Sequence, residues 1–305
     1  MQDNKTTLKQ TFKSADTEEW LDLVFYRRIG YVLALLFRRL HITPNAVTIV
    51  SIIIGAAAGV LYYYNDIRLN AIGILLLIMA NTLDSTDGQL ARMTGQYSRI
   101  GRILDGLSGD IWFIIIYFAI AYRLRDFDGW SWWVYPLGVA AGYSHIMQAA
   151  IADSYRGLHL YFLNGREKSE MESVETLKGE YAKLTWKKNW FKKIVMIFYI
   201  NYTRSQQQFS PAMRKLRSDI ERYYPGGNPP DEVRAEYRKA SLPLLKYTNI
   251  LTFNTRAIVL FITLLINEVW VYYVFELTIM NILLAYMIIR YEKICRSIDE
   301  KITKQ

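Results

Sequence analysis

The chain has 305 residues, of which 52% are hydrophobic and 21% are charged, and its net charge is +9. Apolar blocks of membrane length alternate with segments dense in Lys and Arg, which excludes an ordinary soluble globule, a disordered chain and a fibrous repeat. The single cysteine, Cys295, excludes a disulfide framework. The three histidines are widely spread in the sequence and provide few ligands for a zinc site.

The first 45 residues are expected to form a cytoplasmic tail and an interfacial helix. Between Glu18 and Leu40, apolar side chains recur on one stripe and pairs of arginines stand beside it. A basic amphipathic helix of this kind is typical of one that lies in the membrane interface.

Six stretches are apolar over lengths that suit helices in a membrane. They are residues 46–64, 70–83, 111–122, 132–152, 250–266 and 269–289. Each is expected to be helical, because lipid offers the backbone amides no other partner. The predicted fold is an all-α integral membrane protein with six transmembrane helices, spans one to four within 46–163 and spans five and six within 247–290.

Residues 164–246 are predicted to be a charged cytoplasmic insertion between spans four and five, because they hold 17 basic and 10 acidic residues. Helix starts are expected at Pro211, after the N-cap candidate Ser210, and at Asp231, after two prolines. The stretch that begins at Trp186 is basic and aromatic, and it fits equally a helix on the membrane surface and a solvated helix packed on the protein.

The distribution of basic residues predicts the orientation. Of the 37 Lys and Arg residues, 32 lie in the N-terminal 45 residues, in 92–102, in 164–246 and in the tail from Arg290. By the positive-inside rule these segments face the cytoplasm, as do both termini, including the tail 291–305. We also expect a multi-pass protein of a bacterial cytoplasmic membrane.

Acidic residues gather between spans two and three. Asp84 and Asp87 are three residues apart, so on a helix both project from one face at the cytoplasmic end of span two. Asp105 and Asp110 add two carboxylates at the entry to span three, and a site with oxygen ligands alone suits Mg²⁺ or Mn²⁺. The simpler alternative is a set of ion pairs with the arginines of the same segment, Arg92, Arg99 and Arg102.

The spacing of these residues resembles a family signature. The pattern Asp84-x2-Asp87-Gly88-x2-Ala91-Arg92-x8-Gly101-x3-Asp105 is similar to the motif of the CDP-alcohol phosphotransferases, also called CDP-alcohol phosphatidyltransferases, which are membrane enzymes of phospholipid synthesis. Pro44-Asn45-x2-Thr48, just before span one, is also similar to the family.

One position departs from the family pattern. The family has a fourth aspartate where this chain has Gly109, and the acid, Asp110, comes one residue later. On a regular helix Asp110 lies about 140° from Asp105, so it joins the other acids only where a local bulge turns it toward them.

The resemblance implies that the chain moves a substituted phosphate from a CDP-linked donor to an alcohol and releases CMP. It implies that the CDP group is bound among Asn45, Gly88, Ala91 and Arg92. It also implies two divalent ions, Mg²⁺ or Mn²⁺, held by Asp84, Asp87, Asp105 and Asp110. Either Asp105 or Asp110 would act as the base on the acceptor hydroxyl.

Span four ends in a polar face, along which His145, Gln148, Arg156 and His159 follow three- and four-residue steps or their multiples. Arg156 and His159 are candidates for binding an acceptor phosphate or a donor head group. The alternative is a structural pair of Arg156 with Asp153.

The leading hypothesis is a phosphotransferase of phospholipid synthesis that uses CDP-diacylglycerol and a small polar alcohol or its phosphate. A second hypothesis reverses the roles, with CDP-choline or CDP-ethanolamine as donor and a lipid as acceptor. A hypothesis of another class is a cation transporter, which the clustering of the acids at one face disfavours. The expected partners are these substrates and membrane lipids, without nucleic acid. A ridge of small residues on span one, Ser51, Gly55 and Gly59, suggests close helix packing or a homodimer interface.

Overall fold

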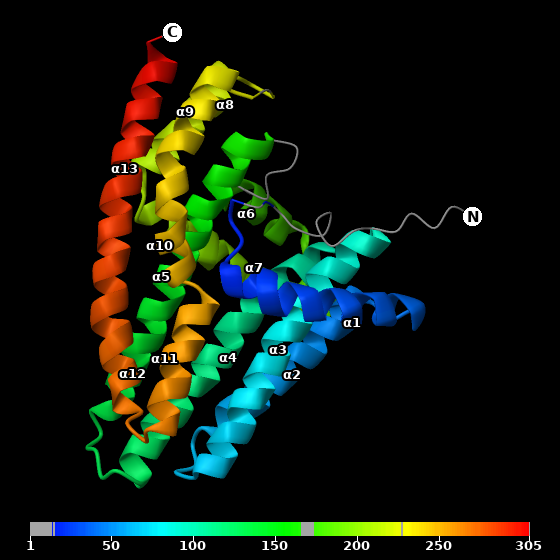
Figure 1. The fold of residues 1–305 in the computed structure, drawn as a ribbon. Helices are drawn as coiled ribbons and strands as arrows, with labels where there is room; N and C mark the ends of the chain where they lie inside the picture. The colour runs from blue at the N-terminus through cyan, green and yellow to red at the C-terminus, as the bar shows by residue number, and fades with distance from the viewer. Residues whose placement is uncertain (1–13, 15, 166–173, 227, 305) are drawn as a thin grey trace. The chain divides into compact units, whose positions relative to one another are not determined.

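The computed structural model describes residue 14 and residues 16–165, 174–226 and 228–304. Within them every regular element is helical, which confirms the predicted all-α class (Figure 1). They divide into two compact units. Unit 1 comprises the described part of Met1–Ser144 together with Phe253–Leu277, and unit 2 comprises the described parts of His145–Thr252 and Thr278–Gln305.

Five helical runs in the described residues are long and apolar enough to cross a membrane. They are Pro44–Leu61, Ile67–Thr94, Ile103–Asp126, Asp231–Leu265 and Trp270–Thr303. Residues 132–152, the expected fourth span, are helical for most of their length, within α5 (Val134–Asn164), but α5 is not among the five. Its mean hydropathy is lowered by polar residues such as His145 and Gln148. The count of six therefore stays a prediction.

Unit 1 is built on three long helices, α2 (Pro44–Leu61), α3 (Ile67–Thr94) and α4 (Arg99–Asp126). The starts of α2 and α3 follow from local chemistry. The Thr43 side chain accepts a hydrogen bond from a first-turn amide of α2, and the Asp66 side chain accepts two in α3. α2 packs along both α3 and α4, so the end of α3 and the start of α4 are held beside the first turns of α2.

The ridge of small residues on α2 serves packing inside the protein. A Cβ atom added to Gly55 would overlap the indole ring of Trp112 on α4, and one added to Gly59 would lie 2.9 Å from Ile115 Cγ2. The ridge therefore lets α4 approach α2 closely, as small residues do in membrane helices. A homodimer stays a prediction.

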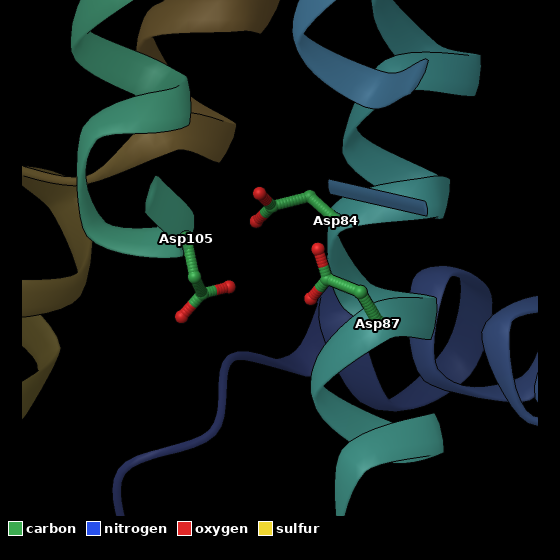
Figure 2. Close-up of side chains that lie close together, drawn as sticks. All are labelled: Asp84, Asp87 and Asp105. Atoms are coloured by element: carbon green, nitrogen blue, oxygen red, sulfur yellow. The ribbon is translucent and has the colours of Figure 1, made fainter. Parts of the chain in front are cut away.

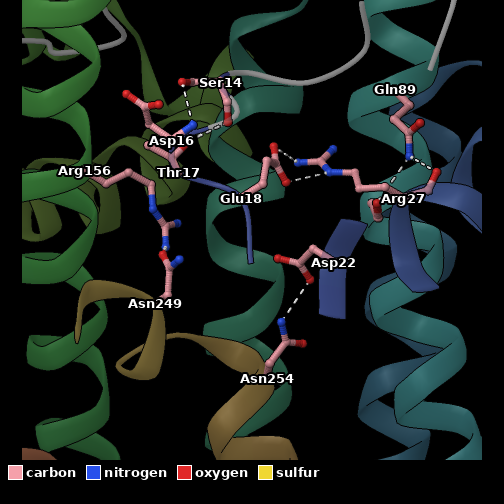
Figure 3. Close-up of polar contacts among 11 residues, drawn as sticks. Ser14, Asp16, Thr17, Glu18, Asp22, Arg27, Gln89, Arg156, Asn249 and Asn254 are labelled. Atoms are coloured by element: carbon pink, nitrogen blue, oxygen red, sulfur yellow. Dashed lines mark hydrogen bonds and ion pairs between the residues drawn. The ribbon is translucent and has the colours of Figure 1, made fainter. Parts of the chain in front are cut away.

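The N-terminal helix begins with a π-helical turn, η2 (Asp22–Tyr26), and continues as α1 (Arg27–Arg39), which lies across α3 (Figure 1). Figure 3 shows two polar contacts at its start, one within the N-terminal segment and one to a residue distant in the chain. Glu18 forms an ion pair with Arg27 at 3.0 Å, and Asn254 Nδ2 donates a hydrogen bond to Asp22 at 3.0 Å. A helix is thus present where the sequence predicts one, and its position in the membrane interface stays a prediction.

Arg123 is fully buried in unit 1 near the end of α4. Its guanidinium donates four hydrogen bonds, to the backbone oxygen of Tyr62 and to the side-chain oxygens of Asn70, Asn65 and Asn267, at 2.5 to 3.3 Å. A buried cation needs such partners. The loops after α2 and after α11 (Phe253–Leu265) are thereby joined to α4.

Unit 2 contains the charged segment, which is helical in pieces as expected. Its helices are α6 (Val174–Lys183), α7 (Trp186–Gln208), α8 (Pro211–Tyr223), α9 (Asp231–Ser241), the 3-10 turn η4 (Leu242–Leu244) and α10 (Leu245–Ile250). The predicted helix starts at Pro211 and Asp231 are confirmed.

The C-terminal helices are α12 (Trp270–Phe275), the π-helical η5 (Glu276–Met280) and α13 (Asn281–Thr303). α8 and α9 pack against α13. The Glu292 carboxylate on α13 accepts hydrogen bonds from the amides of Ala212 and Met213, the first free donors of α8. A carboxylate at a helix N-terminus is stabilising, so Glu292 connects these helices.

Candidate functional site

Three aspartates from two helices meet in unit 1. Asp84 and Asp87 lie on α3 and Asp105 lies on α4, and their carboxylates turn toward one another (Figure 2). One oxygen from each can be chosen so that all three lie within 4.8 Å of one another. Asp87 is 3% exposed, while Asp84 and Asp105 are half-buried. The two aspartates of α3 share a face because they are three residues apart.

Two hydroxyl groups orient these carboxylates. Thr48 Oγ1 on α2 donates to Asp87 Oδ2 at 2.5 Å, and Ser108 Oγ on α4 donates to Asp84 Oδ1 at 2.5 Å. Both hydroxyls are buried. Sequence analysis noted Thr48 only as part of a flanking pattern and missed Ser108. A signal for Ser108 was present, because it follows Asp105 by three residues and therefore lies on the same face of α4.

The carboxylate group fits a divalent cation. Three carboxylates at this separation repel one another, and burial strengthens the repulsion because the surroundings screen it less than water does. Ligands that share one Mg²⁺ or Mn²⁺ lie about 3 to 4 Å apart, given metal–oxygen distances near 2.1 Å. The observed separation is within a side-chain adjustment of that range. Its oxygen-only donors are those that hard cations prefer.

Asp110 does not belong to this group. α4 is α-helical from Arg99 to Asp126 without a bulge, so Asp110 keeps its place on a different side of the helix from Asp105. The structure therefore brings together three of the four predicted metal ligands, and the role predicted for Asp110 stays a prediction.

The Asn45 side chain is hydrogen-bonded to the loop between α3 and α4. Its Oδ1 accepts a hydrogen bond from Ser98 Oγ at 3.1 Å, and Ser98 Oγ in turn accepts one from the amide of Gly101 at 2.8 Å. A Cβ atom on Gly101 would collide with the Asn45 side chain, whereas one on Gly106 would meet nothing within 4 Å. Gly101 is therefore packed against Asn45, while Gly106 faces open space.

Arg92 provides a cation on the same helix as two of the aspartates. Its side chain is half-buried, and its Nη2 lies 3.3 Å from the position that a Cβ on Gly88 would take. The buried Nε of Arg92 has no hydrogen-bond partner among the described residues. Gly88 and the small Ala91 thus leave the guanidinium room beside the helix, where it could bind a phosphate oxygen.

Two further candidates belong to unit 2. Arg156 is half-buried and donates from Nη2 to Asn249 Oδ1 at 3.0 Å (Figure 3). His159 is fully buried, and its Nδ1 lies 2.8 Å from Ser241 Oγ. Ser241 Oγ also donates to Tyr237 O at 2.8 Å, so the imidazole is bonded within a packed interior. These contacts favour a packing role for His159, and binding of substrate by either residue stays a prediction.

Comparison with known proteins reveals similarity over the segment that carries the aspartates. Residues 41–159 match the family model described as CDP-alcohol phosphatidyltransferase. Over 94 residues the chain is 39% identical to the archaetidylinositol phosphate synthase of Pyrococcus horikoshii. That match covers 31% of this chain and 46% of the relative, so it spans about half the length of the curated relative.

Proposed function

Given that residues 41–159 match the family model described as CDP-alcohol phosphatidyltransferase, we propose that the chain moves a substituted phosphate from a CDP-linked donor to the hydroxyl of an alcohol and releases CMP. Five apolar helices, together with a family of membrane enzymes, indicate an integral multi-pass membrane protein. The proposed activity is a step of phospholipid synthesis.

The observation that carries the proposal is the meeting of Asp84, Asp87 and Asp105, with one oxygen of each within 4.8 Å of the others. These three carboxylates would hold Mg²⁺ or Mn²⁺. When bound, the metal would neutralise charge on the pyrophosphate and on the departing CMP. Thr48 and Ser108 would keep two of the carboxylates in the orientation that binding needs.

The CDP group would lie beside Asn45, Gly88, Ala91 and Arg92, as the family motif implies. The Arg92 guanidinium would bind phosphate oxygens, and the absence of a side chain at Gly88 lets the nucleotide approach the helix. Asn45 lies in the first turn of α2, and its side-chain amide would contact the CDP group.

Asp105 is the proposed base. Its carboxylate would accept the proton of the acceptor hydroxyl, and the hydroxyl oxygen would form a bond to the phosphorus that carries the substituent. The bond from that phosphorus to CMP would break, and CMP would leave. Asp110 is the alternative base.

The proposed donor is CDP-diacylglycerol, and the proposed acceptor is a phosphorylated polar alcohol. The name of the Pyrococcus relative denotes synthesis of a lipid with an inositol phosphate group, which favours such an acceptor. Arg156 would bind the acceptor phosphate, since its half-buried guanidinium retains an Nε without a hydrogen-bond partner in the described residues.

The test uses the purified full chain with Mg²⁺, CDP-diacylglycerol and a panel of polar alcohols and their phosphates, including inositol phosphate. CMP and a new phospholipid should appear together. Asp87→Asn should abolish both, whereas Glu232→Gln, which removes one exposed negative charge from α9, should leave them unchanged.

Two outcomes would contradict the proposal. Product formed only from CDP-choline or CDP-ethanolamine with a lipid acceptor would reverse donor and acceptor. Cation movement across a reconstituted membrane without CMP release would indicate a transporter.

A further inference from the structure

α7 differs in charge from the other helices of the charged segment. It contains Lys187, Lys188, Lys192, Lys193 and Arg204 but no Asp or Glu. In contrast, α6, α8 and α9 each contain at least two acidic residues. α7 therefore carries more net positive charge than α6, α8 or α9.

α7 also exposes a row of large apolar side chains. Trp190 and Phe198 are 60% and 59% exposed, and Ile194 and Ile197 are also exposed. At 100° per residue these four positions cover an arc of about 100° on the helix. Such a continuous apolar face on a protein surface indicates an interaction site.

The rest of α7 is held against unit 2. Val195 and Met196 are buried. Near the C-terminal end, Gln206 Nε2 donates to the backbone oxygen of Ala150 on α5 at 3.0 Å. Near the N-terminal end, Lys193 Nζ donates to Leu184 O at 2.9 Å. These contacts direct the row that contains Trp190 and Phe198 away from the body of the unit.

We propose that α7 lies on a bilayer surface that contains anionic phospholipid, with Trp190, Ile194 and Phe198 inserted among the lipids. The backbone of α7 is kinked at Asn189, so the exposed Lys187 and Lys188 precede the kink and the exposed Lys192 follows it; these three lysines would contact lipid phosphates. A helix with one apolar aromatic face, several lysines and no acidic residue matches the chemistry of the interface. This inference goes beyond the proposed reaction and does not depend on it.

Charge and attachment both favour lipid over a protein partner. The lysines complement the negative surface potential of an anionic leaflet, which attracts each nearby cation. The apolar helices of the chain already attach it to a membrane. Binding of α7 to that membrane is therefore intramolecular, so even a modest affinity suffices.

The experiment attaches a nitroxide to the full chain at Ile194→Cys or Phe198→Cys, with Lys239→Cys on α9 as an exposed control. The native Cys295 is buried and stays in place, and the unsubstituted chain serves as the labelling control. The protein is reconstituted in nanodiscs of phosphatidylcholine with or without phosphatidylglycerol. Electron paramagnetic resonance measures the accessibility of each label to oxygen, which concentrates in lipid, and to a water-soluble nickel complex.

In discs with phosphatidylglycerol, the labels at positions 194 and 198 should be accessible to oxygen and protected from nickel, while the label at 239 should be open to nickel. Replacing Lys187, Lys188 and Lys192 with Gln should shift the equilibrium toward water by about fivefold per lysine, or about a hundredfold in all.

Three results would overturn the inference. Labels at 194 and 198 as open to nickel as the label at 239 would show a solvated helix. Labels closed to both reagents would show a protein contact. Insertion that ignores phosphatidylglycerol or the three lysine substitutions would remove the role of anionic lipid.

Discussion

The hydroxyl of Thr48 gives a direct test of how the carboxylates are oriented. It is 2% exposed, and it donates to Asp87 Oδ2 at 2.5 Å while also lying 3.1 Å from Pro44 O. Valine has nearly the shape of threonine but no hydroxyl. Thr48→Val therefore keeps the packing of α2 on α3 and removes the donor to Asp87.

The magnitude follows from that bond. A hydrogen bond to a charged group contributes about 1.5 to 3 kcal/mol. Since each 1.4 kcal/mol is about a tenfold change in an equilibrium constant, this corresponds to roughly 10- to 100-fold. Loss of a group that orients a metal ligand usually costs about the same factor in metal affinity or activity. Thr48→Val should therefore raise the Mg²⁺ concentration needed for half-maximal CMP release by about 10- to 100-fold.

The assay measures CMP release against Mg²⁺ concentration and, independently of turnover, Mn²⁺ binding by electron paramagnetic resonance. Thr48→Ser should restore both, because it restores the hydroxyl. Thr263→Val is the matched control, since Thr263 is also buried in unit 1 and its hydroxyl donates to Leu260 O. If Thr48→Val and Thr263→Val require the same Mg²⁺ concentration, the proposed positioning role of Thr48 is wrong.

Three other predictions concern packing and the shifted acid. Gly55→Ala should lower the free energy of unfolding by about 1 to 3 kcal/mol, because the added methyl group overlaps an indole ring. Gly179→Ala should leave the free energy of unfolding unchanged, because its added methyl group meets nothing within 4 Å. Thermal unfolding in detergent measures both variants. Arg123→Met should lower the free energy of unfolding by about 2 kcal/mol or more, because two buried acceptors, Tyr62 O and Asn70 Oδ1, lose their donor, and a loss below about 1 kcal/mol would contradict this role of its hydrogen bonds. Gly109→Asp combined with Asp110→Gly should keep or raise CMP release because α4 is regular, and abolished release would show that Asp110 is required where it stands.

The sequence by itself determined the helical class, several helix starts and the fact that Asp84 and Asp87 lie on one face of their helix. Long apolar stretches require helices, since lipid cannot satisfy exposed backbone groups. The start at Pro211 follows from the restricted backbone of proline. Asp84 and Asp87 share a face because helix geometry repeats every 3.6 residues. Each of these inferences depends on residues that are near in the chain. The proposed function came from the resemblance of the motif to a known family.

Only the tertiary structure decided which side chains meet across helices. Asp105 reaches the two acids of α3, as the family motif implies, while Thr48 and Ser108 donate to them from α2 and α4. Gly55 is small because an indole ring from α4 occupies the neighbouring space. Such contacts depend on the rotation and axial offset of one helix against another, which many packed side chains set jointly. The sequence pattern of a single helix does not specify that rotation or offset.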